Sequence, residues 1–135
     1  MAGGTYTLLI ELPEAIAPSI GALGSQPLDP GWYAYTGSAL GTGGFSRVDR
    51  HRRVAAGEHD VRHWHVDYLL GHDATALRDV VRAPGADVEC AVASELPTSP
   101  VAGFGASDCD CEAHLAYAAD EAELRRQVEA AYADR

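Results

Sequence analysis

The chain has 135 residues, of which 47% are hydrophobic, and a formal net charge of −10. This length and composition predict one domain, residues 1–135, with its own core, and exclude an intrinsically disordered chain. Twenty acidic residues stand against ten basic ones, all arginine, which excludes broad electrostatic capture of nucleic acid. An acidic surface without lysine is typical of a halophilic, salt-rich cytoplasm, and a GC-rich genome produces the same bias.

The sequence also bears on the compartment. No apolar run approaches the ~20 residues that span a bilayer, and the first residues lack the pattern of a signal peptide. Three cysteines, an odd number, argue against a disulfide framework. We therefore expect a cytoplasmic protein with no membrane association.

Two strands are predicted in the first part of the chain. Residues 5–11 are rich in β-branched, aromatic and aliphatic side chains, which indicates a buried strand. Residues 31–37 repeat that pattern and form a hairpin-like pair with the first strand. The proline-rich residues 13–30 between them predict a loop, with a helical turn over residues 19–23.

A helix is predicted from Phe45 to the residue before Gly57. Its apolar positions point inward: Phe45, Val48 and Ala55. Arg47, Arg50 and His51 share another face at i, i+3, i+4 spacing, so we expect an exposed, cationic surface there. The glycine-rich residues 41–44 provide the turn that leads into this helix.

The second half of the chain alternates short elements. A helix is predicted over residues 64–70, followed by strands over residues 77–82 and 88–93 that the turn signal Pro84-Gly85 joins. Residues 100–118 form a loop that leads into either a helix or a short strand.

The C-terminal helix has the clearest pattern. Asp120 and Glu123 form a capping-box pattern, and the apolar stripe that follows consists of Leu124, Val128, Ala131 and Tyr132. The whole order predicts an α+β fold in which helices flank a small, mostly antiparallel sheet.

Tyrosines and arginines are the first candidates for chemistry. Tyr33 and Tyr35 point to one side of their strand, and Tyr6 on the neighbouring strand can join them. Four arginines and a histidine fall within residues 47–53 of a chain that has few other cations. Phenols beside guanidinium groups can orient water and hold a phosphate. The alternative is that the tyrosines pack in the core and the arginines are a solvated helix face.

These residues resemble the signature of the GIY-YIG nuclease superfamily. Gly4-Thr5-Tyr6 is similar to its first motif, Tyr35-Thr36-Gly37 to its second, and Arg47 to His51 to its Arg-x-x-Arg-His helix, although the glycine turn here is about two residues longer. The match is closer to a mostly stand-alone branch, sometimes joined to endonuclease-III-type proteins. The segments PGWYAYTGSALG, HWHVDYLL and GFGASDCDCEAHL carry that likeness over residues 4–117.

The resemblance implies metal-dependent hydrolysis of phosphodiester bonds in DNA. Tyr6 helps to activate the attacking water, with Tyr35 and His51 close by, and Arg47 stabilises charge on the phosphate. Glu112 holds a Mg²⁺ or Mn²⁺ ion, which needs only one or two carboxylates. The residues expected to contact DNA are Ser38, Arg50, Arg52 and Arg53.

The metal carboxylate has alternatives. Glu112 fits only if residues 108–116 are helical; if residues 114–118 form a strand instead, Asp67 becomes the expected acid. Glu89 and Glu95 are weaker candidates, because acids near strand ends of so acidic a chain are usually solvated.

A second group of residues suggests other chemistry. Cys109, Cys111 and His114, together with the His63/His65 pair, have side chains that can bind zinc, although the CxC spacing is unusual. The commoner alternative is that the cysteines are buried thiols that pack as small hydrophobic side chains. A further one is a cysteine nucleophile with His114 or His65 as its base.

Two other functions therefore stay open. They are a non-catalytic nucleic-acid-binding module on the same scaffold and a zinc-stabilised interaction domain. For an enzyme this small and acidic, we expect weak DNA affinity and a separate DNA-targeting or repair protein as partner.

Overall fold

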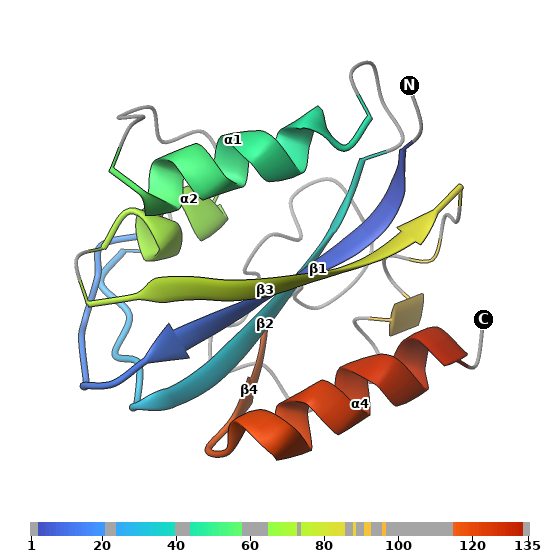
Figure 1. Cartoon of the computed structure of the whole chain (residues 1–135). Helices are drawn as coiled ribbons and strands as arrows, with labels where there is room; N and C mark the ends of the chain where they lie inside the picture. Colours follow the sequence, from blue (N-terminus) through green and yellow to red (C-terminus); the bar gives the residue numbers. More distant parts are fainter. Residues whose placement is uncertain are drawn as a thin grey trace.

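The fold is an α+β arrangement in which helices lie on both faces of one antiparallel sheet (Figure 1). In chain order the elements are β1 (Gly4–Leu12), β2 (Gly31–Ser38), α1 (Ser46–Ala55), α2 (His65–Leu70), β3 (Ala76–Pro84), β4 (Leu115–Ala118) and α4 (Glu121–Ala133). The computed structural model describes residues 3–20, 24–39, 44–57, 65–72, 74–85, 88, 91–92, 96 and 115–133.

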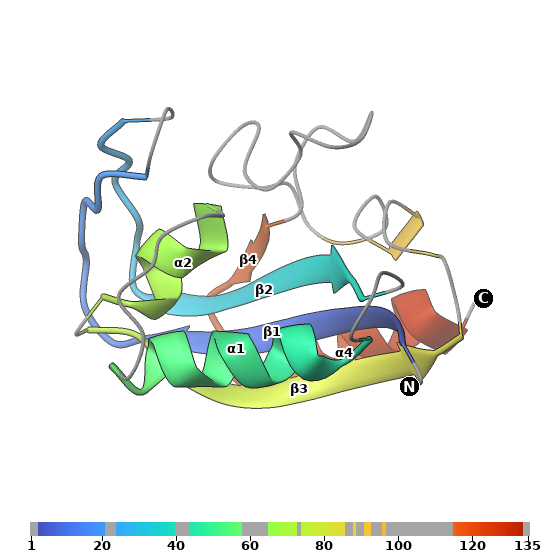
Figure 2. The ribbon, with the colours of Figure 1, turned by 90° about the horizontal axis from the view of Figure 1, so that it is seen from above.

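The sheet has four strands in the order β3-β1-β2-β4, and every neighbouring pair is antiparallel. The α+β fold with an antiparallel sheet is therefore confirmed. Seen from above, α1 and α2 lie over one face of the sheet and α4 lies on the other side (Figure 2). The two central strands, β1 and β2, are thus covered on both faces.

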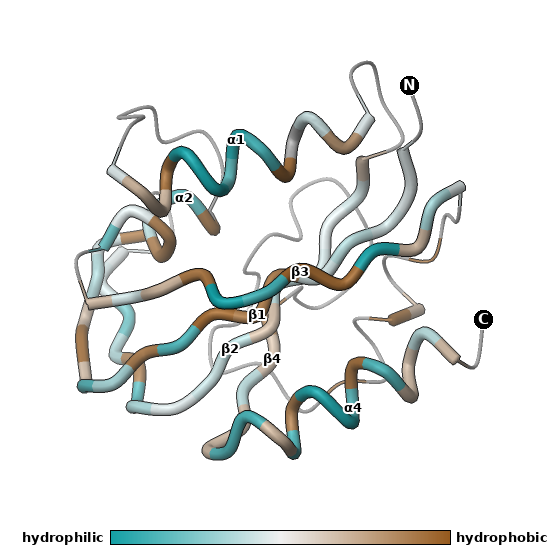
Figure 3. Tube along the Cα trace, in the orientation of Figure 1, coloured by the Kyte–Doolittle hydropathy of each residue, from teal (hydrophilic) through white to brown (hydrophobic). Residues whose placement is uncertain are grey.

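Side-chain alternation along β1 supplies both halves of the core. Tyr6, Leu8 and Ile10 point into the cluster under α1 and α2, whereas Leu9 points into the cluster under α4. Because both faces are covered, the strand reads as a nearly continuous apolar run rather than an alternating one. Hydrophobic positions also recur between hydrophilic ones along α1 and α4 (Figure 3), as expected for helices that each bury one side.

The three predicted helices are confirmed, the second over residues 65–70, since residue 64 lies outside the described part. α1 starts after Phe45, and Gly57 follows it with a φ of 77°, a left-handed conformation that favours glycine. At the start of α4, Oδ2 of Asp120 accepts a hydrogen bond of 3.3 Å from the backbone N–H of Glu123. Within the described part of the chain, no helix combines the length and the apolar character that crossing a membrane requires.

The strand predicted over residues 88–93 is wrong. Ala91 and Val92 are helical, and the N–H of Val92 donates to the carbonyl of Val88 at 2.8 Å, as in an α-helical turn. Val88, Val92 and Leu96 all pack in the core cluster under α4. Their four-residue spacing is typical of one side of a helix, whereas the apolar composition of residues 88–93 alone does not distinguish a helix from a strand.

Two further expectations are settled by backbone pairing. The prediction of a helical turn over residues 19–23 is wrong at Ser19, because Ser19 forms an antiparallel bridge with Ser25. Ile16 forms a second antiparallel bridge, with Leu28. This segment folds back on itself. Of the two options left for the end of residues 100–118, the strand is correct, since Leu115–Ala118 is β4 and pairs with β2.

Candidate active site

Three aromatic side chains from β1, β2 and α1 meet under the helical layer. We call Tyr6, Tyr35 and His51 the tyrosine–histidine cluster. A hydrogen bond of 2.7 Å joins the hydroxyl of Tyr6 to Nε2 of His51. The ring centroids lie 5.5 Å apart for Tyr6 and His51, 6.2 Å for Tyr35 and His51 and 6.5 Å for the two tyrosines. The prediction that the tyrosines share one side of the sheet is confirmed.

Strand register explains how the two tyrosines come together. Tyr6 on β1 lies directly opposite Gly37 on β2. A Cβ atom built on Gly37 would lie 2.6 Å from the hydroxyl oxygen of Tyr6 and 3.1 Å from Cε2 of Tyr35. Both tyrosine rings therefore fill the space over this glycine, and no other residue fits there without moving them.

The cluster is nearly closed to solvent. Tyr6 and His51 are each 1% exposed, and Tyr35 is 7% exposed. The prediction that His51 belongs to an exposed cationic face is wrong. His51 follows the buried Val48 by three residues and precedes the buried Val54 by three, so its ring lies on the side of α1 that faces the sheet.

Arg50 and Asp67 form an ion pair between α1 and α2. The guanidinium donates to Oδ1 of Asp67 at 2.9 Å and to Oδ2 at 3.0 Å, and the two side chains are 14% and 0% exposed. Two parallel bonds of this kind are the strongest form of carboxylate–arginine contact. Arg50 therefore binds a carboxylate within the protein, instead of facing solvent as the helix pattern predicted.

Tyr33 lies on the same face of the sheet but is not part of the cluster. Its hydroxyl donates to the carbonyl of Asp29 at 2.7 Å, and its ring stacks at a tilt 5.0 Å from that of Tyr117. Burial, with smaller contributions from Tyr117 and Asp29, raises the pKa of the Tyr33 phenol well above its ordinary value. The Tyr33 hydroxyl therefore links β2 to Asp29 in the segment before it.

Residues 5–135 of the chain match the family described as "Domain of unknown function DUF123". The chain belongs to this family. No curated protein and no solved structure shows a significant match to it. The DUF123 match includes the whole tyrosine–histidine cluster and the Arg50–Asp67 pair, so both features lie within the family's domain.

The remaining predicted site residues of this DUF123 chain fall into three groups. Arg52 and Arg53 are exposed in the last turn of α1, and Ser38 ends β2. Arg47 lies in the first turn of α1 and His65 begins α2, but their side chains are outside the described part. The residues that lie wholly outside it are Glu112, Cys109, Cys111, His114 and His63.

The described residues contain no ready cluster of metal ligands. Among them, no three His, Cys, Asp or Glu side chains come close enough to hold a metal. Both carboxylate oxygens of Asp67 bind Arg50, so Asp67 is not an available ligand. The expected role of Glu112 required a helix over residues 108–116, and this condition fails, because Leu115 and Ala116 belong to the strand β4.

Sequence reasoning missed the Arg50–Asp67 pair and the burial of His51. The spacing of His51 from Val48 and Val54 carried the signal for burial, because it repeats the apolar period of α1. No local pattern pairs Arg50 with Asp67, since the contact depends on how α1 packs on α2.

Proposed function

We propose that this DUF123 chain is a GIY-YIG-type endonuclease that hydrolyses phosphodiester bonds in DNA with the help of Mg²⁺ or Mn²⁺. The observation that carries the proposal is the 2.7 Å hydrogen bond between Tyr6 and His51, with Tyr35 alongside. A phenol and an imidazole in direct contact can exchange a proton, which is the chemistry that a general acid–base site needs.

The motif strands support the superfamily assignment. Gly4-Thr5-Tyr6 lies on β1 and Tyr35-Thr36-Gly37 lies on β2, and these strands pair with each other. Tyr6 is opposite Gly37, so the last residues of the two motifs are in contact. The short motifs thus form one structural unit with the first helix, which is the arrangement that the resemblance implies.

The chemistry proposed for the cluster is proton transfer. When Nε2 of His51 is unprotonated, the Tyr6 hydroxyl donates to it, and the imidazole can accept the phenolic proton. The oxygen of Tyr6 can then take a proton from an attacking water. Tyr35, the most exposed member of the cluster at 7%, marks the side from which substrate would approach.

The cations of α1 are proposed to hold the substrate. Arg47 is carried by the first turn of the helix that bears His51, and Arg52 and Arg53 are exposed at its other end. Guanidinium groups bind phosphate oxygens through paired N–H donors. Because the chain has a net charge of −10, long-range attraction of DNA is weak, and a separate DNA-targeting or repair protein is proposed to deliver the substrate.

Burial of the cluster favours one alternative function, a non-catalytic nucleic-acid-binding module on the same scaffold. Tyr6 and His51 are 1% exposed, so a phosphate reaches them only if the site opens. Asp67, the acid that would replace Glu112 as metal ligand, is engaged by Arg50. In this alternative the tyrosine–histidine cluster stabilises the fold and the exposed arginines alone bind DNA.

A plasmid-nicking assay distinguishes the two functions. Purified protein is incubated with supercoiled DNA and Mn²⁺ or Mg²⁺, with chelator as the metal-free control. The matched variants are Tyr6→Phe and Tyr33→Phe, which each remove one buried hydroxyl from the same face of the sheet. The endonuclease proposal expects metal-dependent nicking that is lost in Tyr6→Phe and kept in Tyr33→Phe. DNA binding without nicking by the folded wild-type protein would favour the binding module.

A further inference from the structure

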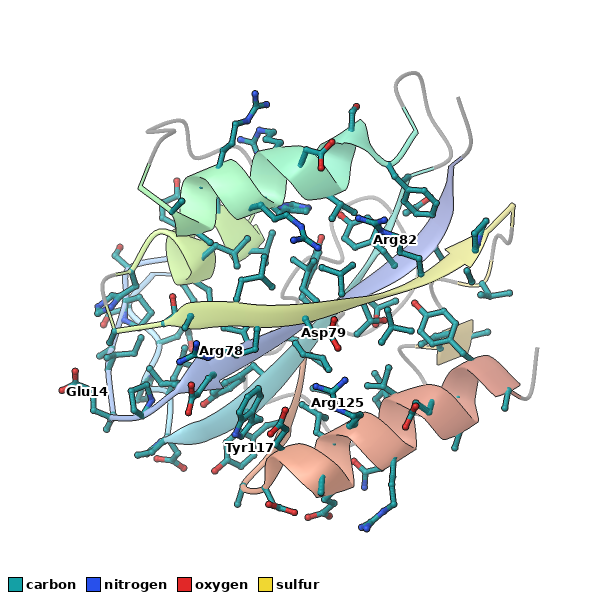
Figure 4. All side chains as sticks on the ribbon, viewed as in Figure 1. Glu14, Arg78, Asp79, Arg82, Tyr117 and Arg125 are labelled. Atoms are coloured by element: carbon teal, nitrogen blue, oxygen red, sulfur yellow. The ribbon has the colours of Figure 1, made fainter. Side chains whose placement is uncertain are left out.

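Arg82 on β3 lies next to Tyr6 and has an unusual partner. Strand pairing places Arg82 directly opposite Tyr6, so their side chains leave the same face of the sheet. The side chain of Arg82 is exposed, and its Cζ lies 5.4 Å from the centroid of the Phe45 ring, at the start of α1. In Figure 4 Arg82 lies between β3 and α1, away from the acidic side chains around Arg78 and Arg125.

Other arginines of this acidic chain bind carboxylates. Among the described residues, Arg50 binds Asp67, Arg78 binds Glu11, and Arg125 binds both Asp79 and Glu121. Arg82 makes no ion pair with any described carboxylate. A guanidinium stacked on an aromatic ring is held in place while its N–H donors stay available in its plane. Arg82 is therefore fixed beside the cluster with its donors open to an outside anion.

We call the surface between α1 and β3, from Arg82 beside Phe45 to Arg52 near the other end of α1, the α1–β3 groove. Its hollowed part lies at the Arg52 end. A cavity of about 460 Å³ lies between the C-terminal end of α1 and the first half of β3, and Arg52 lines it. Phe45 and Arg52 are separated by two turns of α1, about 10 Å along the helix axis. Arg82 beside Phe45 and Arg52 therefore lie toward opposite ends of α1, so they can contact different phosphates of one strand.

The acidic groups near this groove set its selectivity. Asp79 also lines the cavity, but its carboxylate accepts a 2.6 Å bond from Arg125 and lies between β3 and α4 (Figure 4). Asp49 is exposed on α1 between Phe45 and Arg52. Asp79 also attracts the charge of Arg52. A phosphate of one strand can bind at each arginine, whereas a phosphate placed beside Asp49 between them is repelled.

We propose that the α1–β3 groove binds the phosphodiester backbone of a nucleic-acid strand, with Arg82 as the contact beside Tyr6 and Arg52 as the second contact. The inference rests on the proposed function, because it places the bound strand next to the tyrosine–histidine cluster. It adds a phosphate-binding residue outside the motif strands and the arginine helix.

The test measures DNA binding separately from cleavage. A short fluorescein-labelled DNA duplex is titrated with wild-type protein, Arg82→Gln, Arg82→Lys and Arg126→Gln over a range of salt concentrations, with chelator present. Arg126 is exposed on α4, so Arg126→Gln makes the same change of charge on another element. Urea unfolding of each variant establishes that it is folded.

Arg82→Gln is expected to weaken binding about tenfold, the value of a charge-assisted phosphate contact. It also lowers the slope of log K against log salt by about 0.9, the loss of one phosphate contact. Arg82→Lys recovers the slope but only part of the affinity, because lysine lacks the planar pair of donors. Arg126→Gln changes neither quantity.

Equal effects of Arg82→Gln and Arg126→Gln would overturn the inference, as would a wild-type protein that binds no DNA at low salt. The plasmid assay keeps the two proposals apart. If the wild type and Arg82→Gln nick the plasmid at the same rate, the proposed binding at the α1–β3 groove is wrong and the endonuclease proposal stands. A specific loss of binding in Arg82→Gln without any nicking by the wild type would support the groove and overturn the endonuclease.

Discussion

Replacing Asp67 by alanine tests the ion pair between α1 and α2. The Asp67 side chain is 0% exposed, and Arg50 binds both of its oxygens, at 2.9 and 3.0 Å. The substitution leaves a guanidinium that is 14% exposed facing the space the carboxylate filled. Removing one partner of a buried pair costs about 3–5 kcal/mol. Because Arg50 keeps some contact with water, we expect the low end of this range, about 3 kcal/mol.

Urea and thermal unfolding measure this loss. The entropy of unfolding per residue predicts that about 3 kcal/mol lowers the Tm of a 135-residue chain by about 10 °C. The double variant Arg50→Met, Asp67→Leu is the matched control. It removes both charges and replaces them with apolar side chains of similar size, so it is expected to recover most of the stability.

Two results would refute this reasoning. A loss below about 1 kcal/mol in Asp67→Ala would mean that the pair behaves like an exposed surface pair. A double variant less stable than Asp67→Ala would mean that the carboxylate stabilises the fold through something other than Arg50.

Three further predictions follow from the described contacts. Gly37→Ala places a Cβ 2.6 Å from the Tyr6 hydroxyl and should cost about 1–3 kcal/mol in urea unfolding, whereas wild-type stability would contradict the close contact. Tyr132→Phe removes a 2.8 Å bond to Thr7 and should cost about 1 kcal/mol in urea unfolding. Burial raises the pKa of Tyr132 to about 12, so in an absorbance titration this phenol should ionise at higher pH than an exposed tyrosine. The hydrogen bond from Arg125 lowers the pKa of Asp79 from its ordinary value of 3.8. The contribution of this ionised pair to folding stability is therefore complete above about pH 4 and is lost as the pH falls through the lower pKa of the folded state. In Asp79→Asn, stability should fall less steeply with acid over this range, and an unchanged dependence of stability on pH would exclude the pair as its source.

Local sequence patterns were sufficient for the central sheet. The apolar runs of β1 and β2 and the alternation of Tyr33 and Tyr35 predicted two paired strands with phenols on one face, which the structure confirms. The N-terminal cap at Asp120 and the apolar stripe of α4 were also predictable from the sequence, because both are local features of one helix.

Contacts between elements far apart in the sequence could not be predicted from it. The placement of Arg82 opposite Tyr6 depends on the β1–β3 register, which shifts at Leu9/Ile10. No neighbouring residue in the sequence specifies that shift. The pairing of Arg50 with Asp67 likewise follows from helix packing. His51 is different, because its spacing within α1 already indicated a buried face.

A double-mutant cycle on Tyr6 and His51 tests the central claim most directly. Single-turnover nicking rates are measured for the wild type, Tyr6→Phe, His51→Phe and the double variant, with Tyr33→Phe as control. If the hydrogen-bonded pair transfers the proton, each single variant loses at least about 10²-fold, and the double variant is no slower than the slower single one, because the two residues act as a unit. A wild-type rate in Tyr6→Phe, or losses that multiply in the double variant, would contradict it.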